Sequence, residues 1–324
     1  MLIAVRVLNS KSRYNQLELI SGRMATVVSG DIVIGALGHR NALHGYAGHL
    51  PDSLQVGSTI QILNIGGVLG ICDSANPDVG PPFECEVLGT VLAFPYLGQR
   101  IGVPARAGGA ARLQADAALD TKGVPVVMLA GTCMDSGKTA AACAIIGRLR
   151  HHGFRVAACK ATGVSLRRDV LAMEDAGAID TMLFADLGVV TTTADNGPPI
   201  ARALLSTLAG KAPDAIVLEL GDGLLGAYGV DSILADDTIR DAIAAIVLCA
   251  NDPVAAWGGA RILREHYGLT PAVVTGPATD NAVGVRQVRQ HLDLAAINAL
   301  TDGAALGDAI AGAIGLRRSV RVAS

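Results

Sequence analysis

Aromatic residues make up only 3% of the 324-residue chain, and its formal net charge is −3 at pH 7. So few aromatic side chains argue against a base-stacking platform, and the lack of excess positive charge argues against a nucleic-acid partner. No apolar stretch reaches the roughly 18 residues of a membrane span. The first residues, MLIAVRVLNSKSRYNQ, lack the apolar core and cleavage site of a signal peptide. We therefore expect a cytoplasmic protein without a nucleic-acid or membrane partner.

The chain also lacks any CxxC pair, and its cysteines lie mostly in apolar runs, which predicts reduced core thiols and no zinc site. Histidines 39, 44 and 49 are spaced by five residues, which fits neither one helix face nor one strand face, so we do not favour a metal site there. Lysine occurs only five times. Two of the five, Lys138 and Lys160, stand where phosphate chemistry would need them.

Residues 1–100 contain short β-like runs separated by Gly, Asp, Asn and Pro, and several of these runs alternate apolar and polar residues. They predict a small all-β domain, a barrel or sandwich of about six strands. The clearest runs are 24–28, 31–35, 59–64, 68–72 and 84–91. Residues 101–122 carry Pro, Gly and Ala without a strong period and are interpreted as a linker.

From residue 123 to 324, apolar strands alternate with helical segments, which predicts an α/β domain with a mainly parallel sheet of the P-loop NTPase type. Ligands of such sheets bind at the carboxyl ends of the strands. The expected strands are 124–130, 154–160, 214–220, 244–250 and 271–275. The expected helices are 138–151, 198–209, 236–244, 253–266, 280–291 and 304–314.

The first of these strands, VPVVMLA, leads through the loop GTCMDSGKT into an Ala-rich helix. This strand–loop–helix order is the context that a phosphate loop requires, because glycines let backbone N–H groups surround an anion at a helix N-terminus. Lys138 supplies a full positive charge, and the Thr139 hydroxyl would serve Mg²⁺. A plain tight turn is the less favoured interpretation. The predicted phosphate-binding residues are Gly131, Thr132, Asp135, Ser136, Gly137, Lys138 and Thr139.

The loop has one residue more than the commonest spacing, since Thr132 stands where the first glycine would be. In this it resembles the GTDTxxGKT loop of dethiobiotin synthetase and its amidoligase and kinase relatives. RVAACKATG at 155–163 is similar to the second strand of that family, and VLELGDG at 217–223 resembles its Val-Glu-Gly-x-Gly-Gly strand end. ATG followed by DAGAIDTMLFADLG resembles a P-loop family that includes D-glutamate N-acetyltransferases. The resemblance covers residues 123 to about 290 only and implies a dimer with its site near the interface.

Glu219, Lys160 and one of two aspartates are further candidates for catalysis and metal binding. Glu219 closes a buried strand, so its carboxylate should emerge beside the loop and organise Mg²⁺, although a carboxylate bonded to local N–H groups is the alternative. Lys160 ends the second strand, and the resemblance implies that it meets substrate or the transferring phosphate. A surface lysine is the alternative. By the same resemblance, Asp169 or Asp175 would be a second metal acid. The spacing does not decide between them.

The dipeptide Asn251-Asp252 follows the strand at 244–250 and precedes a proline. Asn251 could contact adenine, but capping of the next helix is the favoured role for this dipeptide. Thr275-Gly276-Pro277, at the end of the next strand, is a second candidate for contacts with the base. Arg167 and Arg168 suit a carboxylate or a phosphate, or they are solvated loop residues.

These residues favour an ATP- and Mg²⁺-dependent kinase or ligase that phosphorylates or activates a small carboxylate-bearing metabolite. Lys138, Lys160 and Glu219 would be catalytic, and Thr139, Glu219 and Asp169 would serve the metal. One alternative is an N-acyltransferase whose loop binds the phosphates of acetyl-CoA. The other is a non-catalytic nucleotide-binding switch, which is disfavoured because Thr132 and Cys133 stand where such switches carry an extra lysine. We expect a homodimer.

Overall fold

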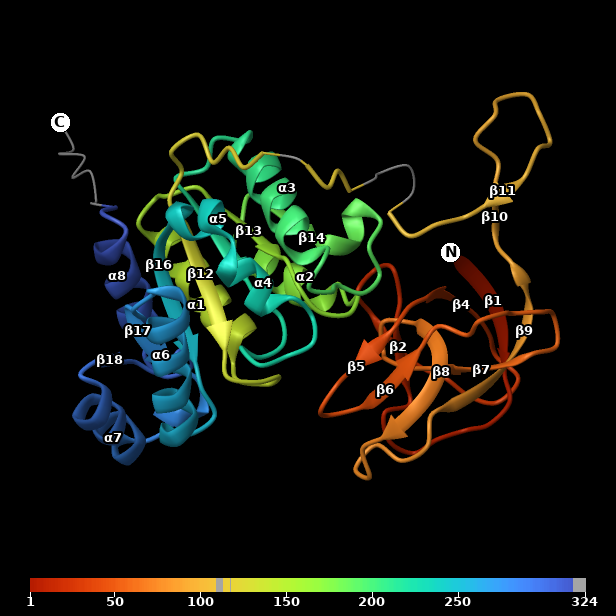
Figure 1. The fold of residues 1–324 in the computed structure, drawn as a ribbon, viewed down its shortest axis with the longest axis horizontal. Helices are drawn as coiled ribbons and strands as arrows, with labels where there is room; N and C mark the ends of the chain where they lie inside the picture. The colour runs from red at the N-terminus through yellow and green to blue at the C-terminus, as the bar shows by residue number, and fades with distance from the viewer. Residues whose placement is uncertain (109–112, 117, 317–324) are drawn as a thin grey trace. The chain divides into compact units, whose positions relative to one another are not determined.

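The computed structural model describes residues 1–108, 113–116 and 118–316, which form two compact units (Figure 1). The first unit is Met1–Leu113 together with two short segments from later in the chain, Val164–Arg168 and Phe184–Thr192. The second unit contains the remainder from Gln114 onward. Parts of the predicted linker, residues 109–112 and 117, and the last eight residues of the predicted C-terminal domain lie outside the described residues.

The first unit is built on an antiparallel barrel. Its sheet has the order β4-β1-β9-β7-β8-β6-β5, and a parallel pairing of β4 with β8 closes the ring. The inward side chains alternate along the strands, with Val5, Ile60, Leu69 and Cys85 completely buried. The ring strands are β1 (Leu2–Val7), β4 (Ile32–Leu37), β7 (Thr59–Ile62), β8 (Val68–Ala75) and β9 (Phe83–Thr90).

Short strands surround this ring. β5 (Arg40–Asn41) and β6 (Tyr46–His49) extend the sheet beyond β8, whereas β2 (Gln16–Glu18) pairs with β3 (Met24–Thr26). β10 (Leu92–Ala93) pairs with β11 (Val103–Pro104), so the β structure continues into residues 101–122, which were interpreted as a linker. The sequence interpretation did not include β1, although LIAVRV alternates in burial as a half-buried strand should.

The second unit confirms the predicted α/β class, because its seven-stranded sheet is entirely parallel and has the order β14-β13-β15-β12-β16-β17-β18. β12 and β15 are fully buried along their whole length, as apolar strands covered on both faces should be. The strands are β12 (Val126–Gly131), β13 (Val156–Lys160), β14 (Asp180–Leu183), β15 (Ala215–Glu219), β16 (Ile243–Cys249), β17 (Val273–Thr275) and β18 (Ala295–Ala296).

Helices connect the parallel strands and cover both faces of this sheet. α1 and α8 pack together over one face, against Val127, Leu129 and Val217, whereas α6 lies against Leu248 on the other face (Figure 1). The helices are α1 (Lys138–His151), α2 (Arg168–Asp175), α3 (Gly197–Ala209), α4 (Val230–Ala235), α5 (Asp237–Ala242), α6 (Pro253–Tyr267), α7 (Ala282–Leu292) and α8 (Gly303–Ala313). Two 3₁₀ turns, η1 (Phe184–Leu187) and η2 (Pro277–Thr279), complete the set in the described chain.

In the second unit most predicted elements are found within one or two residues of their expected positions, but α2, α4, β14 and β18 of this unit were missed. The helix expected at 236–244 is shorter than predicted, because Ile243 already belongs to β16. None of the helices in the described ranges is long and apolar enough to cross a membrane. All six cysteines, which lie in the described part of the chain, are free thiols.

α8 is fastened to α1 by one carboxylate. Asp308 accepts two hydrogen bonds of 2.7 Å from Arg148, and His152 Nε2 lies 2.6 Å from the same carboxylate. Hydrogen bonds from Arg148 and His152 lower the pKa of Asp308 to about 2. The stability that this carboxylate contributes is therefore present above about pH 4 and is lost as the pH falls toward 2.

We expect Asp308→Asn to destabilise the protein at pH 7 by less than about 1 kcal/mol, because the pair is half exposed. The same substitution should make the loss of stability between pH 4 and 2 less steep. Urea unfolding at several pH values measures both effects, and Asp241→Asn, at an exposed position of α5, is the matched control. Equal acid sensitivity of the two variants would contradict this assignment.

Candidate functional site

The loop between β12 and α1 has the conformation of an anion-binding loop. Asp135 and Gly137 both have left-handed backbone angles, with φ of 56° and 87°, and α1 begins directly at Lys138. No side chain caps this helix, and its first turn contains no acidic residue. The N–H groups of the first turn are therefore left for an anion bound in the loop. The Ser136 side chain is completely buried inside the loop. Left-handed Asp135 is a strained position for a residue that is not glycine, as is common at functional sites.

Lys138 folds back over this loop. Its ammonium donates a 2.8 Å hydrogen bond to the Cys133 carbonyl oxygen and lies 3.3 Å from Ser136 Oγ. Gly131 makes room for this arrangement, because a Cβ there would lie 2.4 Å from Ser136 Oγ and 2.6 Å from Lys138 Nζ. Burial lowers the pKa of Lys138, although the nearby Glu219 carboxylate opposes that effect. A buried cation whose hydrogen bonds go to two neutral oxygens is suited to an anionic ligand.

Thr139, the next residue, connects the loop to β15. Its hydroxyl donates a 2.9 Å hydrogen bond to Oε2 of Glu219, the last residue of β15. Glu219 is only 1% exposed, and its position follows from the sheet, since β15 is the direct neighbour of β12. A hydroxyl oxygen and a carboxylate oxygen at the edge of a phosphate loop form the kind of hard donor pair that Mg²⁺ prefers.

Lys160 lies on the other side of Glu219, at the end of β13. Its ammonium is 3.4 Å from Glu219 Oε1 and forms an ion pair with Asp169 in the first turn of α2. Burial disfavours the charge on Lys160, but the Glu219 and Asp169 carboxylates more than offset it and raise the pKa of this lysine above its usual value. Two lysines and two carboxylates are thus gathered at the carboxyl ends of adjacent parallel strands.

The segment after β15 packs tightly on the loop. A Cβ at Gly221 would lie 2.3 Å from the Thr162 carbonyl oxygen, and one at Gly223 would lie 2.7 Å from the Thr132 carbonyl oxygen. Asp222, between them, has φ of 79°. Burial raises the pKa of Asp222, and hydrogen bonds from the Gly223 and Ala227 N–H groups act against it. Asp222 is thus a carboxylate bonded to its own loop.

We expect Gly221→Ala to destabilise the protein by about 1–3 kcal/mol, because the clash is with backbone that cannot move aside easily. The melting temperature should fall by several degrees. Gly258→Ala is the matched control, since a Cβ at this position of α6 meets nothing within 4 Å and alanine is the better helix former. Differential scanning calorimetry of both variants tests this, and a Gly221→Ala variant as stable as the wild type would contradict it.

A cavity of about 660 Å³ opens where β16 and β17 end, and its size is within the usual range for ligand sites. Pro277 links it to the phosphate loop, because Gly137 lies next to Gly276 and Pro277. Asn251 and Gln287 are exposed in the cavity wall. Its other lining residues are Asp252, Pro253, Pro277, Ala278, Asn281, Ala282, Val283 and Gly284.

The helix caps around this cavity are clear in the structure. Asp252 accepts hydrogen bonds of 2.8 Å from the N–H groups of Val254 and Ala255, so the favoured capping role is confirmed for Asp252, and Asn251 is left facing the cavity. Asn281 caps α7 in the same way. Thr275 has a structural role, because its hydroxyl oxygen accepts a hydrogen bond from the Ala299 N–H group. Sequence reasoning missed Asn281 and Gln287, whose only signal is their proximity to the start of α7.

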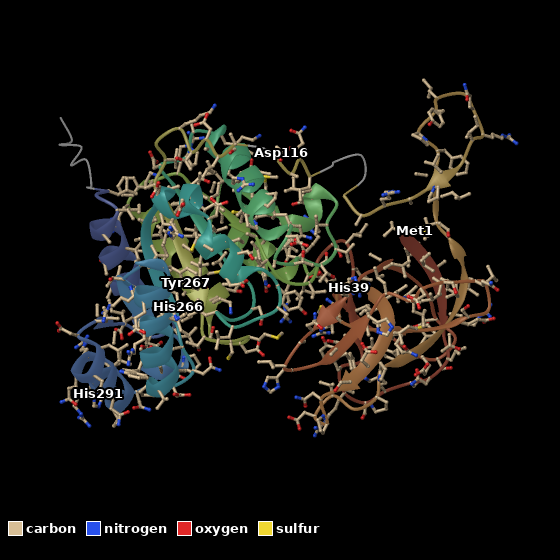
Figure 2. The ribbon with its side chains drawn as sticks, viewed as in Figure 1. Met1, His39, Asp116, His266, Tyr267 and His291 are labelled. Carbon is tan, nitrogen blue, oxygen red and sulfur yellow. The ribbon has the colours of Figure 1, made fainter. Side chains whose placement is uncertain are left out.

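Other sequence candidates are not brought to this site. Asp175 is exposed at the far end of α2, so of the two aspartates it is Asp169 that pairs with Lys160, and its role toward a metal stays a prediction. Arg167 and Arg168 lie in the first unit, where their backbone N–H groups donate hydrogen bonds to the Glu18 carboxylate. His49 pairs with Asp73, whereas His39 lies between β4 and β5 (Figure 2).

The described residues contain no group of three or more His, Cys, Asp or Glu side chains arranged to hold a metal by themselves. This is compatible with Mg²⁺ on a phosphate loop, because that ion usually takes only one or two protein ligands and completes its shell with phosphate and water. Thr139 and Glu219 fit this donor set.

No family model matches the chain, and no curated protein is similar to it in sequence. Solved structures with a partial likeness include the signal recognition particle receptor FtsY from Elizabethkingia anophelis, with 14% identity, a TM-score of 0.43, and coverage of 59% of this chain and 66% of that one. A duf1611 family protein from Anabaena variabilis shows 13% identity, a TM-score of 0.42 and 63% coverage of both chains. The hydrogenase maturation factor HypB from Archaeoglobus fulgidus shows 14% identity, a TM-score of 0.43, and coverage of 59% and 91%.

In the first two of these structures the match spans less than two thirds of the neighbour's own length. The class of the second unit therefore rests on its own geometry: a parallel sheet, a phosphate loop after a central strand, and an acidic residue at the end of the adjacent strand. This is the architecture of a P-loop α/β domain.

Proposed function

We propose that the chain is an enzyme that binds ATP with Mg²⁺ and transfers the γ-phosphoryl group to a small carboxylate-bearing metabolite. The observation that carries this proposal is the hydrogen bond between Thr139 and Glu219 beside the phosphate loop. A loop that held only the phosphates of coenzyme A would not require a buried carboxylate at this position. The proposal agrees with the resemblance to dethiobiotin synthetase in the loop and in the second strand.

Selection of adenine is inferred from the cavity beside Gly276 and Pro277. Asp252 caps α6 through Oδ1, and the amides of Asn251 and Gln287 are exposed in the wall. An amide side chain both donates and accepts, which matches the amino group and ring nitrogen of adenine. Asn251 thus becomes the proposed base-reading residue.

The roles of the remaining groups follow from charge. Lys138 and the loop N–H groups would hold the β- and γ-phosphates, while Thr139 and Glu219 would hold Mg²⁺, which offsets the charge of the phosphates. Lys160 would face the transferring group and the substrate carboxylate, with Asp169 fixing its position. In the reaction a substrate oxygen bonds to the γ-phosphorus as the bond to the β-phosphate oxygen breaks and ADP leaves.

The test is ADP formation by the full-length chain with ATP, with and without Mg²⁺, over a panel of small mono- and dicarboxylates. The proposal predicts ADP release that needs Mg²⁺ and rises with particular carboxylates, with phosphate found on the substrate or its product. It is overturned by metal-independent acyl transfer from acetyl-CoA, or by ATP turnover that no acceptor accelerates.

A further inference from the structure

The first unit carries an apolar projection. Residues 91–105, here called the arm, leave the end of β9 and return to β1 through the β10–β11 pair (Figure 1). The base is fixed by three backbone hydrogen bonds: Leu2 N to Ala105 O, Val91 N to Leu2 O, and Ala105 N to Val91 O. The two sides lie close together, since a Cβ at Gly102 would be 2.8 Å from Leu92 Cδ1. The arm is an ordered hairpin attached to the barrel.

Its apolar side chains face solvent. Leu97 at the tip is fully exposed, Phe94 is 62% exposed, and the side chains of the arm stand out around its loop (Figure 2). The at least half-exposed set is Leu92, Phe94, Tyr96, Leu97 and Ile101. At roughly 100–200 Å² for each fully exposed side chain, these exposures amount to about 300–600 Å² of apolar surface, a large part of the roughly 800 Å² that one partner contributes to a standard interface. Clusters of this size mark interaction sites.

The same unit carries a second exposed apolar surface. Val28, Ile32 and Ile34, here called the strip, are each at least half exposed, and the two isoleucines lie on the outward face of β4. Ile34 pairs across the sheet with Ala4, so the neighbouring position on β1 is small and leaves the isoleucine open to a partner. The strip belongs to the same wall of the barrel as the base of the arm, because β1 pairs with β4 and also bonds to the arm.

We infer that the arm of one copy docks on the strip of a second copy, and that the reciprocal contact closes a two-fold homodimer. Two arms and two strips together would bury apolar area well within the range of stable dimers. The charge pattern favours a protein partner over a lipid surface, since the segment 92–104 contains a single basic residue, Arg100. Membrane-binding hairpins and helices usually need several basic groups.

Sedimentation velocity of the full chain at micromolar concentration tests the inference. We expect a species of twice the 33.0 kDa chain mass. Leu97→Asp on the arm and Ile34→Asp on the strip should each weaken dimerisation by roughly 30-fold or more and yield monomers. Ile20→Asp is the control, because Ile20 is an isoleucine of this unit that is nearly as exposed as Leu97 and belongs to neither surface, so the variant should remain dimeric.

A mixing experiment separates arm–strip docking from other dimers. The Leu97→Asp chain retains an intact strip and the Ile34→Asp chain retains an intact arm, so an equimolar mixture should regain dimer through one intact contact, while neither variant dimerises alone. A monomeric wild type, a dimer that survives Leu97→Asp, or no recovery on mixing would overturn the inference. Pelleting of monomeric wild type with vesicles of mixed neutral and anionic lipid would overturn it in favour of a membrane surface.

Discussion

Lys138→Ala is expected to abolish stabilisation of the protein by Mg²⁺–ATP. A ligand present at 100 times its dissociation constant should stabilise the wild type by about 2.7 kcal/mol, and the variant should show none of this increase. The physical reason is that Lys138 is the buried cation at the helix N-terminus, held by the Cys133 carbonyl until an anion binds. Phosphoryl transfer should fall by about 10²–10³-fold or more. Thermal melts with and without nucleotide measure the first effect.

Two further variants make this result specific. Lys138→Met retains most of the side-chain volume, so a loss shared by both variants is a loss of charge and not of loop packing. Lys211→Ala is the lysine control. Lys211 precedes β15, so it lies at the amino ends of the strands, away from the loop, and it pairs with Asp180 at 3.6 Å. Undiminished Mg²⁺–ATP stabilisation of Lys138→Ala would contradict the assignment of the loop.

Glu219→Gln should remove the magnesium dependence while leaving nucleotide binding partly intact. The amide is isosteric with the carboxylate and can still accept a hydrogen bond from Thr139, so the fold should be retained. The negative charge is lost, however, both for Mg²⁺ and for Lys160 at 3.4 Å. We expect the affinity for ATP to become nearly insensitive to Mg²⁺ and turnover to drop by about 10²–10³-fold.

Magnesium titrations at fixed ATP, followed by calorimetry, test this second expectation. Glu265→Gln is the matched control, since Glu265 is an exposed residue of α6 that pairs with Arg261 and should have no effect on the metal. If Glu219→Gln retains the full magnesium response, Glu219 does not organise the metal, and the carboxylate is then a structural partner of Thr139 and Lys160.

Local signals explain which parts of this architecture could be predicted. The helix at 138–151 was predicted at the residues where it is found, because the apolar strand, the glycine break and the Ala-rich run all lie next to one another in the chain. β14 and β18 are short and partly buried, so their existence depends on the strands beside them and not on their own composition. The closure of the barrel by β4 and β8 is likewise a long-range pairing.

The same distinction holds for the site. Lys138, Thr139 and Glu219 could be predicted from the ends of buried strands, since adjacent parallel strands must bring their carboxyl ends together. The choice of Asp169 over Asp175 could not, because it depends on where α2 begins relative to Lys160. Nor could the sequence show that residues 164–168 and 184–192 belong to the first unit. Glu18 and Asn64, which form hydrogen bonds with residues 164–168, lie about a hundred residues or more earlier in the chain.

We propose above all that the phosphate loop and Glu219 together bind a nucleoside triphosphate with its metal. The most direct measurement is the melting temperature of the wild-type chain with ATP and Mg²⁺, with ATP and EDTA, and with acetyl-CoA. We expect a clear rise with ATP that requires Mg²⁺ and little change with acetyl-CoA. A metal-independent rise with acetyl-CoA and none with ATP would contradict it and would identify an acyltransferase built on a phosphate loop.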